Sequence, residues 1–164
     1  MDAWDNVSLK PIKVNFKTKT GGKGWYQNNS TWYYFTNSGT KYTGWLSYNK
    51  NWYYFDQSRG AMQTGWAFIN GKWYFFTKDG QMKTGWVKDG GKWYFLDNSG
   101  AMKTSWLYNG NKWYFFDNSG VMKLGWLQQG KQWYYFKPDG SMVTSTYTIS
   151  GKVNYFQPNG VWKK

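Results

Sequence analysis

The sequence predicts an all-β solenoid of stacked β-hairpins, with about 20 residues per repeat. The first observation is a series of six tryptophan pairs whose members lie seven positions apart: Trp25/Trp32, Trp45/Trp52, Trp66/Trp73, Trp86/Trp93, Trp106/Trp113 and Trp126/Trp133. The second is that a turn-forming sequence separates the two members of each pair, which is typical of a hairpin. The third is that aromatic residues make up 24% of the 164 residues, so rings must supply most of the buried surface. An isolated hairpin is marginal in water, and stacking on its neighbours would bury these rings.

The repeats divide the sequence into three parts. Residues 1–22 are expected to form an N-terminal tail and a degenerate capping repeat, because Ile12 to Phe16 keeps only half of the pattern. Residues 23–145 hold the six repeats. Residues 146–164 are expected to form a degenerate C-terminal capping repeat, in which Thr146 and Val153 replace the two tryptophans.

The N-terminus carries no targeting signal that the sequence reveals. Met1-Asp2-Ala3-Trp4-Asp5 lacks the basic region and apolar run of a signal peptide. No apolar run approaches the ~20 residues that a membrane-spanning helix needs.

The third repeat shows why each unit is expected to be a hairpin. Asn70-Gly71 lies between two aromatic runs, and this dipeptide favours a type I′ turn, in which both central residues have positive φ. Such a turn places Phe68 opposite Trp73 and Trp66 opposite Phe75. Because side chains alternate along a strand, both tryptophans should lie on one face. The other face should carry Ala67, Ile69, Tyr74 and Phe76.

The turns and loops vary between repeats, although six residues always separate the tryptophans. The other turns are expected at Asn28-Asn29-Ser30, Gly90-Gly91, Asn109-Gly110 and Gln129-Gly130. Arg59 is a one-residue insertion in the second loop. The aspartates that precede the loop glycines are interpreted as turn residues, because a short acid bonds its own local backbone: Asp56, Asp79, Asp97, Asp117 and Asp139.

Composition argues against an enzyme. The sequence has no cysteine, histidine or glutamate, which removes thiol nucleophiles, histidine bases and nearly all zinc chemistry. We therefore expect no catalytic residue, metal or cofactor. The net charge of +13 favours polyanionic partners, although lysines that only keep an aromatic surface soluble would explain it equally well.

The tryptophan pairs are suited to holding a quaternary ammonium group, which has no N–H to donate and binds aromatic faces through cation–π and apolar contact. A purely packing role would tolerate Leu or Phe, yet all six repeats keep both tryptophans and the tyrosine after the second. Rings at the third and fourth positions of the run that begins with the second tryptophan are interpreted as core. Methionine recurs once per unit and suits either packing or a site wall.

This pattern of Gly-Trp, six residues, Trp-Tyr-aromatic, a loop glycine and x-Met-x-Thr-Gly-Trp resembles the choline-binding repeats of Gram-positive surface proteins and phage lysins. The resemblance covers about residues 23–162. It implies a left-handed superhelix of hairpins and choline sites between successive hairpins. It also implies non-covalent attachment to phosphocholine on teichoic or lipoteichoic acid, and hence an extracellular location on the cell wall.

Carried onto this sequence, the resemblance implies five sites, each with two tryptophans from one hairpin and a tyrosine and a methionine from the next. The five sets are Trp25, Trp32, Tyr53 and Met62; Trp45, Trp52, Tyr74 and Met82; Trp66, Trp73, Tyr94 and Met102; Trp86, Trp93, Tyr114 and Met122; and Trp106, Trp113, Tyr134 and Met142.

Three departures from the family pattern bear on these sites. A sixth site at Trp126 and Trp133 is not expected, because Asn154 stands where the tyrosine should be. Tyr42 is read as replacing a methionine, and Arg59 puts the placement of Met62 in question.

Two other functions compete with choline binding. A glucan- or other carbohydrate-binding repeat module would use the same aromatic faces for sugar stacking. A basic, aromatic nucleic-acid binder fits the composition, but the strict two-tryptophan geometry does not call for it. The sequence leaves the oligomeric state, monomer or homodimer, open.

Overall fold

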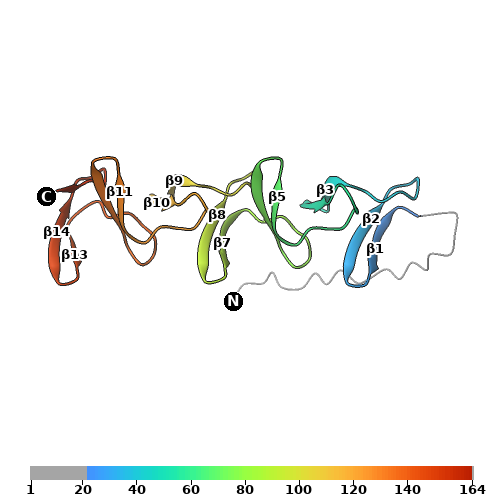
Figure 1. The fold of residues 1–164 in the computed structure, drawn as a ribbon, viewed down its shortest axis with the longest axis horizontal. Helices are drawn as coiled ribbons and strands as arrows, with labels where there is room; N and C mark the ends of the chain where they lie inside the picture. The colour runs from blue at the N-terminus through green and yellow to red at the C-terminus, as the bar shows by residue number, and fades with distance from the viewer. Residues whose placement is uncertain (1–21, 164) are drawn as a thin grey trace. The chain divides into compact units, whose positions relative to one another are not determined.

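The computed structural model describes residues 22–163, and all regular elements in this range are β-strands (Figure 1). The chain divides into two compact units, Met1–Lys83 and Thr84–Lys164. The expected tail and the half repeat at Ile12 to Phe16 lie outside the described residues. Within residues 22–163, no helix has the length and apolar character that crossing a bilayer demands.

Each unit is a series of antiparallel hairpins. The first unit contains β1 (Gly24–Asn28) with β2 (Thr31–Phe35), β3 (Gly44–Tyr48) with β4 (Asn51–Phe55), and β5 (Gly65–Ile69) with β6 (Lys72–Phe76). The second contains β7 (Gly85–Asp89) with β8 (Lys92–Leu96), β9 (Ser105–Asn109) with β10 (Lys112–Phe116), β11 (Gly125–Gln129) with β12 (Gln132–Phe136), and a three-stranded sheet of β13 (Tyr147–Ile149), β14 (Lys152–Phe156) and β15 (Trp162–Lys163). The all-β class and the stacked hairpins are confirmed; the left-handed sense and the three-part domain division stay predictions.

The register predicted for the third hairpin is confirmed. Phe68 pairs with Trp73 and Trp66 pairs with Phe75. Asn70 and Gly71 have φ of 49° and 80°, as the two central positions of a type I′ turn require.

Two of the expected turns lie one residue further along the chain. In the fifth hairpin Asn109 pairs with Lys112, so the turn is Gly110-Asn111 rather than Asn109-Gly110. In the sixth, Gln129 pairs with Gln132, so Gly130 is the first turn residue rather than the second. The constant spacing of the tryptophans decides the register, and the turn residues have to follow it.

The two faces of a hairpin differ in burial. On the third hairpin Ala67, Ile69 and Phe76 are buried, whereas Phe68 and Trp73 are exposed. In the second to sixth hairpins, the fourth residue of the Trp-Tyr run is at most 1% exposed: Phe55, Phe76, Leu96, Phe116 and Phe136. The equivalent Phe35 of the first hairpin is half-buried. The core prediction is therefore confirmed for this position in five of the six hairpins. The tryptophans lie on the opposite face, where Trp25 is buried and the others are half-buried or exposed.

Hydrogen bonds join successive hairpins within each unit. The backbone N–H of Met62, which follows the second hairpin, donates to the carbonyl of Trp32 in the first at 2.8 Å. The same bond at 2.8 Å recurs from Met82 to Trp52, from Met122 to Trp93 and from Met142 to Trp113. Each of these four methionines is thereby held beside the second tryptophan of the preceding hairpin.

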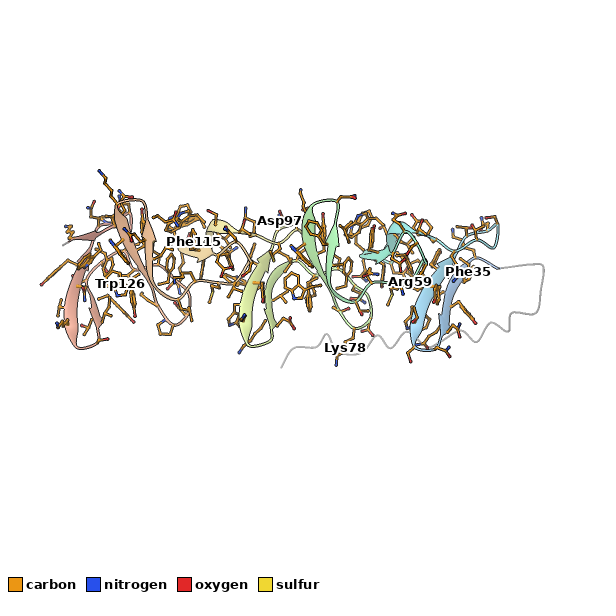
Figure 2. All side chains as sticks on the ribbon, in the orientation of Figure 1. Phe35, Arg59, Lys78, Asp97, Phe115 and Trp126 are labelled. Atoms are coloured by element: carbon orange, nitrogen blue, oxygen red, sulfur yellow. The ribbon has the colours of Figure 1, made fainter. Side chains whose placement is uncertain are left out.

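The aspartates confirm the turn interpretation in four loops. Asp97 Oδ1 accepts hydrogen bonds from the backbone and hydroxyl of Ser99 at 2.8 and 2.6 Å. Asp56, Asp117 and Asp139 bond their own loops in the same way. The inserted Arg59, labelled in Figure 2, donates its backbone N–H to Asp56 Oδ1 at 2.6 Å, so the longer loop closes on the same acid.

Candidate functional site

Two tryptophans from one hairpin form perpendicular walls. Their ring centroids lie 6.2–6.3 Å apart and their planes meet at 82–86° in the pairs Trp25/Trp32, Trp45/Trp52, Trp86/Trp93 and Trp106/Trp113. The hairpin register explains this constancy, since the first tryptophan and the residue opposite the second are two positions apart on one face. The sequence prediction that each pair shares a face is thus met with a fixed geometry.

The third wall is a tyrosine from the next hairpin. Tyr53 lies 4.9 Å from Trp25, Tyr74 lies 4.9 Å from Trp45, Tyr114 lies 4.8 Å from Trp86, and Tyr134 lies 5.0 Å from Trp106. The ring planes meet at 68–70° in all four. The structure therefore brings together the rings of four of the five predicted sets.

The repeated methionines pack against a third hairpin. A Cβ built on Gly80 would overlap the side chain of Met62, and one built on Gly140 would overlap that of Met122. Met102 and Met142 meet Gly120 and Gly160 in the same way. The methionine side chain thus packs on the glycine of the loop that follows the next hairpin.

The fourth set lines an open cavity. Trp86, Trp93, Tyr114 and Met122, the four residues predicted for this site, line a cavity of about 420 Å³ together with Asp139. The Trp93 ring is 40% exposed, and the other three predicted residues are half-buried. A cavity of this size accommodates a small organic ligand.

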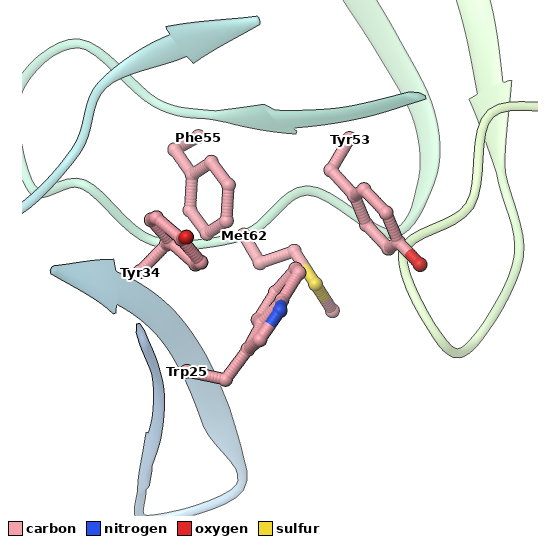
Figure 3. Close-up of a cluster of buried hydrophobic side chains, with 5 residues drawn as sticks. All are labelled: Trp25, Tyr34, Tyr53, Phe55 and Met62. Atoms are coloured by element: carbon pink, nitrogen blue, oxygen red, sulfur yellow. The ribbon is translucent and has the colours of Figure 1, made fainter. Parts of the chain in front are cut away.

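The first set is more closed than the fourth. Trp25, Tyr53 and Met62 belong to a buried cluster with Tyr34 and Phe55. Figure 3 shows the Met62 sulfur beside the Trp25 indole, so the Arg59 insertion does not displace this methionine. Tyr48 adds a ring 5.6 Å from Trp25. The third hairpin has Ile69 at this position, and the next three hairpins have polar residues such as Asn109.

The third set divides between the two units. Trp66 and Trp73 lie in the first unit, whereas Tyr94 and Met102 lie in the second. In its own unit, Trp66 packs at 5.1 Å against Phe75 across the hairpin. The assembly of this set stays a prediction.

Asp139 is a site residue that the sequence analysis assigned only to a turn. It performs the turn role, because it accepts hydrogen bonds from the backbone and hydroxyl of Ser141 at 2.9 and 2.6 Å. These bonds, with the ammonium of Lys112 at 3.2 Å, lower the pKa of the Asp139 carboxyl to about 2. The carboxylate in the wall of the fourth cavity is therefore charged at any physiological pH.

Asp79 has the equivalent place beside the first set. It precedes Gly80, which contacts Met62, just as Asp139 precedes Gly140, which contacts Met122. The pKa of the Tyr53 phenol is raised, chiefly by burial and in part by the nearby charge of Asp79, while a hydrogen bond with Gln81 opposes the rise. The signal in the sequence is the residue before the loop glycine, which is acidic in these loops and serine at Ser99 and Ser119.

The interpretation of Tyr42 as the replacement for a methionine is wrong. In the later repeats an isolated β-bridge joins the methionine to the last residue of the preceding strand, as Met82 is joined to Phe76. In the first loop the equivalent bridge joins Lys41 to Phe35. Lys41 therefore stands at the methionine position, and its ammonium lies 4.3 Å from the centre of the Tyr33 ring. Tyr42 instead donates its hydroxyl to the Trp45 carbonyl at 2.8 Å.

The chemistry open to these cages is the binding of a cation without acid–base steps. Aromatic faces at right angles surround a small space and attract positive charge through their ring quadrupoles, with tryptophan the strongest of the three aromatic types. The one carboxylate that lines the fourth cavity has no paired acid in its wall. Residues 22–163 contain no cluster of three or more metal-ligating His, Cys, Asp or Glu side chains.

Comparisons with known proteins agree with this geometry. The family model described as a choline-binding repeat matches residues 23–64, 63–106, 103–147 and 123–163. No curated protein shows significant sequence similarity to the chain.

Solved structures with the same fold include two proteins of Streptococcus pneumoniae. CbpJ from strain TIGR4 is 38% identical, with a TM-score of 0.83 over 87% of this chain and 52% of that protein. Choline binding protein F, solved in the presence of a peptidoglycan analogue, is 39% identical, with a TM-score of 0.81 over the same shares of 87% and 52%. The modular Cpl-1 endolysin, complexed with a peptidoglycan analogue, is 33% identical over 85% of this chain and 41% of its own, with a TM-score of 0.54. The chain thus spans about half the length of these relatives or less.

Proposed function

This chain belongs to the choline-binding repeat family, and we propose that it acts as a non-catalytic module that binds phosphocholine on cell-wall teichoic or lipoteichoic acids. The observation that carries the proposal is the fourth cavity, whose lining consists of the four predicted residues Trp86, Trp93, Tyr114 and Met122 with a carboxylate beside them. The five predicted sets would be the ligand sites, and the protein would be held non-covalently on the outer surface of the wall.

The physical match is to the trimethylammonium end of choline. This group carries a full charge but has no N–H, so it gains from ring faces and a nearby carboxylate without needing a hydrogen-bond acceptor. Each ring contributes about 0.5–2 kcal/mol, depending on how far the contact is desolvated. Three rings then support weak to moderate affinity at one site, and a polymer that presents the ligand repeatedly would gain avidity from several sites.

The acidic residues support a binding role over a catalytic one. Asp56, Asp97, Asp117 and Asp139 all direct an oxygen into their own loop. Their pKa values are lowered, with hydrogen bonds outweighing the effect of desolvation in the first three. A general acid would need a raised pKa, so these carboxyls suit turn-building and attraction of a cation.

A carbohydrate ligand is a second candidate because two of the predicted cage tryptophans also pair with an exposed ring across their own hairpin. Phe68 lies 5.2 Å from Trp73 and Tyr108 lies 5.1 Å from Trp113 across their hairpins, and all four rings are exposed. The two rings of each pair are tilted by 48–49°, and an exposed ring face can stack on a sugar, so the test of function must include a glucan.

A choline titration followed by tryptophan fluorescence and thermal melting tests the proposed function. We expect a saturable fluorescence change at about millimolar choline and a rise in Tm, because a ligand of the folded state stabilises it. The matched control is 3,3-dimethylbutanol, the neutral isostere of choline, which should act much more weakly. If dextran changes both signals while choline changes neither, the choline proposal is wrong and the carbohydrate candidate is favoured.

A further inference from the structure

The sixth tryptophan pair also has a third ring, although its tyrosine is missing. Trp126 and Trp133 meet at 6.2 Å and 81°, as in the other cages. Asn154 takes the tyrosine's place, because it pairs with Tyr147 as Tyr134 pairs with Leu127. The ring that faces Trp126 is instead Trp162, whose centroid lies 5.3 Å away at an interplanar angle of 73°.

Trp162 combines two positions of the ordinary cage. Its backbone pairs with Phe156, as the backbone of Met142 pairs with Phe136. Its ring, however, has the near-perpendicular relation to the first tryptophan that tyrosine has elsewhere, at 4.8–5.0 Å and 68–70°. One residue at the methionine position therefore supplies the wall that Asn154 cannot.

Asn154 holds the replacement ring in place. Its Oδ1 accepts a hydrogen bond from the indole Nε1 of Trp162 at 3.1 Å, and its own amide donates to the Lys152 carbonyl at 3.0 Å. A tyrosine at position 154, by contrast, would place its own ring beside Trp126, as Tyr134 does beside Trp106. The short amide leaves this space to Trp162 and fixes the orientation of the indole.

The three tryptophan rings are less buried than rings that only fill the core. Phe156 is buried beneath Trp126, with its ring 5.9 Å away, whereas Trp126, Trp133 and Trp162 are all half-buried. Tryptophan is the strongest of the aromatic side chains in cation–π contact. We propose that Trp126, Trp133 and Trp162 form a sixth quaternary-ammonium site, built from three tryptophans; this inference rests on the proposed choline-binding function.

Fluorine NMR of the full chain labelled with 5-fluorotryptophan tests the sixth site separately from the fourth. The resonances are assigned with Trp162→Phe, Trp133→Phe and Trp93→Phe, and choline chloride is titrated at constant ionic strength. We expect the Trp162, Trp133 and Trp93 resonances all to shift saturably with choline, and several-fold less with 3,3-dimethylbutanol.

Two results would overturn the proposal in different ways. If Trp93 responds while Trp133 and Trp162 stay unchanged up to saturation, the sixth cluster only packs, and choline binding by the predicted sites stands. If Trp93 is unchanged too, the proposed function fails and the sixth site with it.

Variants then separate a direct site from a transmitted shift. Trp162→Leu should abolish the Trp133 response and leave the Trp93 response intact. The conservative Trp162→Phe keeps a ring, so the Trp133 response should persist and saturate at several-fold higher choline. A Trp133 response that is the same in wild type and in a folded Trp162→Leu protein would refute the role of the third ring. If Trp162→Leu disturbs the fold, the test depends on Trp162→Phe. A choline concentration at half-saturation of the Trp133 resonance that is the same in Trp162→Phe and in the wild type would contradict the proposal.

Discussion

At the residue scale, the aromatic side chains of this chain fall into two classes: exposed rings that line the cages and buried rings that pack in the core. Second tryptophans such as Trp52, Trp73, Trp93 and Trp113 remain 40–47% exposed although their type would favour burial. The residue three positions after each of these tryptophans, a phenylalanine or Leu96, is fully buried and packs in the core. An exposed ring that is held at a constant angle to its neighbour contributes little to stability, so the two classes should respond differently to substitution.

The first prediction compares one residue of each class in the same strand. Trp93→Leu should remove choline binding at the fourth cage while changing the free energy of unfolding by about 1 kcal/mol or less. Leu96→Ala should lower that free energy by about 2–5 kcal/mol, because it empties a fully buried position. Urea unfolding followed by circular dichroism measures both. Equal losses of stability would show that Trp93 is a packing residue.

The second prediction concerns the carboxylate in the fourth cavity. Asp139→Asn should weaken choline binding there by up to about fivefold at low salt, since an exposed charge interaction is worth about 0.2–1 kcal/mol. Asparagine keeps an oxygen for the Ser141 hydrogen bonds, so the loop should survive. Asp117→Asn is the control, because Asp117 makes the same loop bonds outside the cavity lining. Equal affinities in the two variants would remove Asp139 from the site.

The third prediction is a dependence of stability on pH below about 4. The pKa of Asp139 falls from 3.8 to about 2 on folding, and those of Asp56, Asp97 and Asp117 are also lowered. Above the unfolded value these carboxylates stabilise the fold, and the contribution is lost as the pH falls through the folded values. Thermal melting should thus show a Tm that is level between about pH 5 and 7 and drops towards pH 2. Asp139→Asn should reduce the fall in Tm between pH 5 and pH 2. The same fall in the variant and the wild type would contradict the lowered pKa of Asp139.

At the scale of elements, a hairpin is specified locally and its neighbour holds it in place. The strand pairing within each hairpin follows from six residues between tryptophans. The junctions depend on one backbone hydrogen bond from a methionine and on a glycine beneath that methionine, as with Met122, Trp93 and Gly140. A substitution at a junction glycine should therefore be more destabilising than the same substitution at a glycine in a hairpin turn.

The fourth prediction compares two glycines of similar conformation. Gly140 and Gly130 both have positive φ, 80° and 60°, so alanine should cost about 1–2 kcal/mol at either position. At Gly140 the added Cβ would also overlap Met122, whereas at Gly130 nothing lies within 4 Å. Gly140→Ala should be the more destabilising variant in urea unfolding and should also weaken choline binding at the fourth cage. Equal effects of the two variants would mean that the methionine is not held by the glycine.

At the scale of the whole molecule, charge and repetition act together. The net charge is +13, whereas the cages attract a cation, so the protein's field opposes free choline but favours a polymer with phosphates. Lysines such as Lys112 lie at the surface, where salt screens them. Binding of the isolated ligand and of the polymer should therefore depend differently on ionic strength.

The fifth prediction follows from that difference. Between about 0.05 and 0.5 M NaCl, affinity for a phosphocholine-bearing teichoic acid should fall by roughly tenfold or more, because the Debye length shrinks to a few ångströms. Affinity for free choline should change by no more than about twofold, since it depends on short-range ring contacts. Surface plasmon resonance on immobilised polymer and calorimetry with choline provide the two measurements. A salt-independent polymer affinity would assign the lysines to solubility alone.

Much of the architecture was predictable because it repeats and because it is local. The tryptophan spacing predicted the register between Trp66 and Phe75, and the acids before loop glycines predicted the turns at Asp97 and Asp117. Local turn chemistry alone was less reliable: Asn109-Gly110 looked like the turn, but the pairing of the aromatic strands placed it at Gly110-Asn111. The error at Tyr42 was avoidable, because Lys41 lies four positions before Trp45 just as Met82 lies four before Trp86.

The all-β class, the register of the third hairpin and the rings of four of the five predicted cages could be predicted from the amino-acid sequence, because strand alternation and tight turns act over a few residues. The other residues that reach a cage could be identified only from the packing of the hairpins. Asp139 lies 53 positions after Trp86 and Trp162 lies 36 after Trp126, yet each completes a wall. Contacts at such separations depend on how one hairpin packs on the next and on which loop folds over the junction. Asn154 therefore looked like the loss of a sixth cage, whereas its amide holds the ring that takes the tyrosine's place.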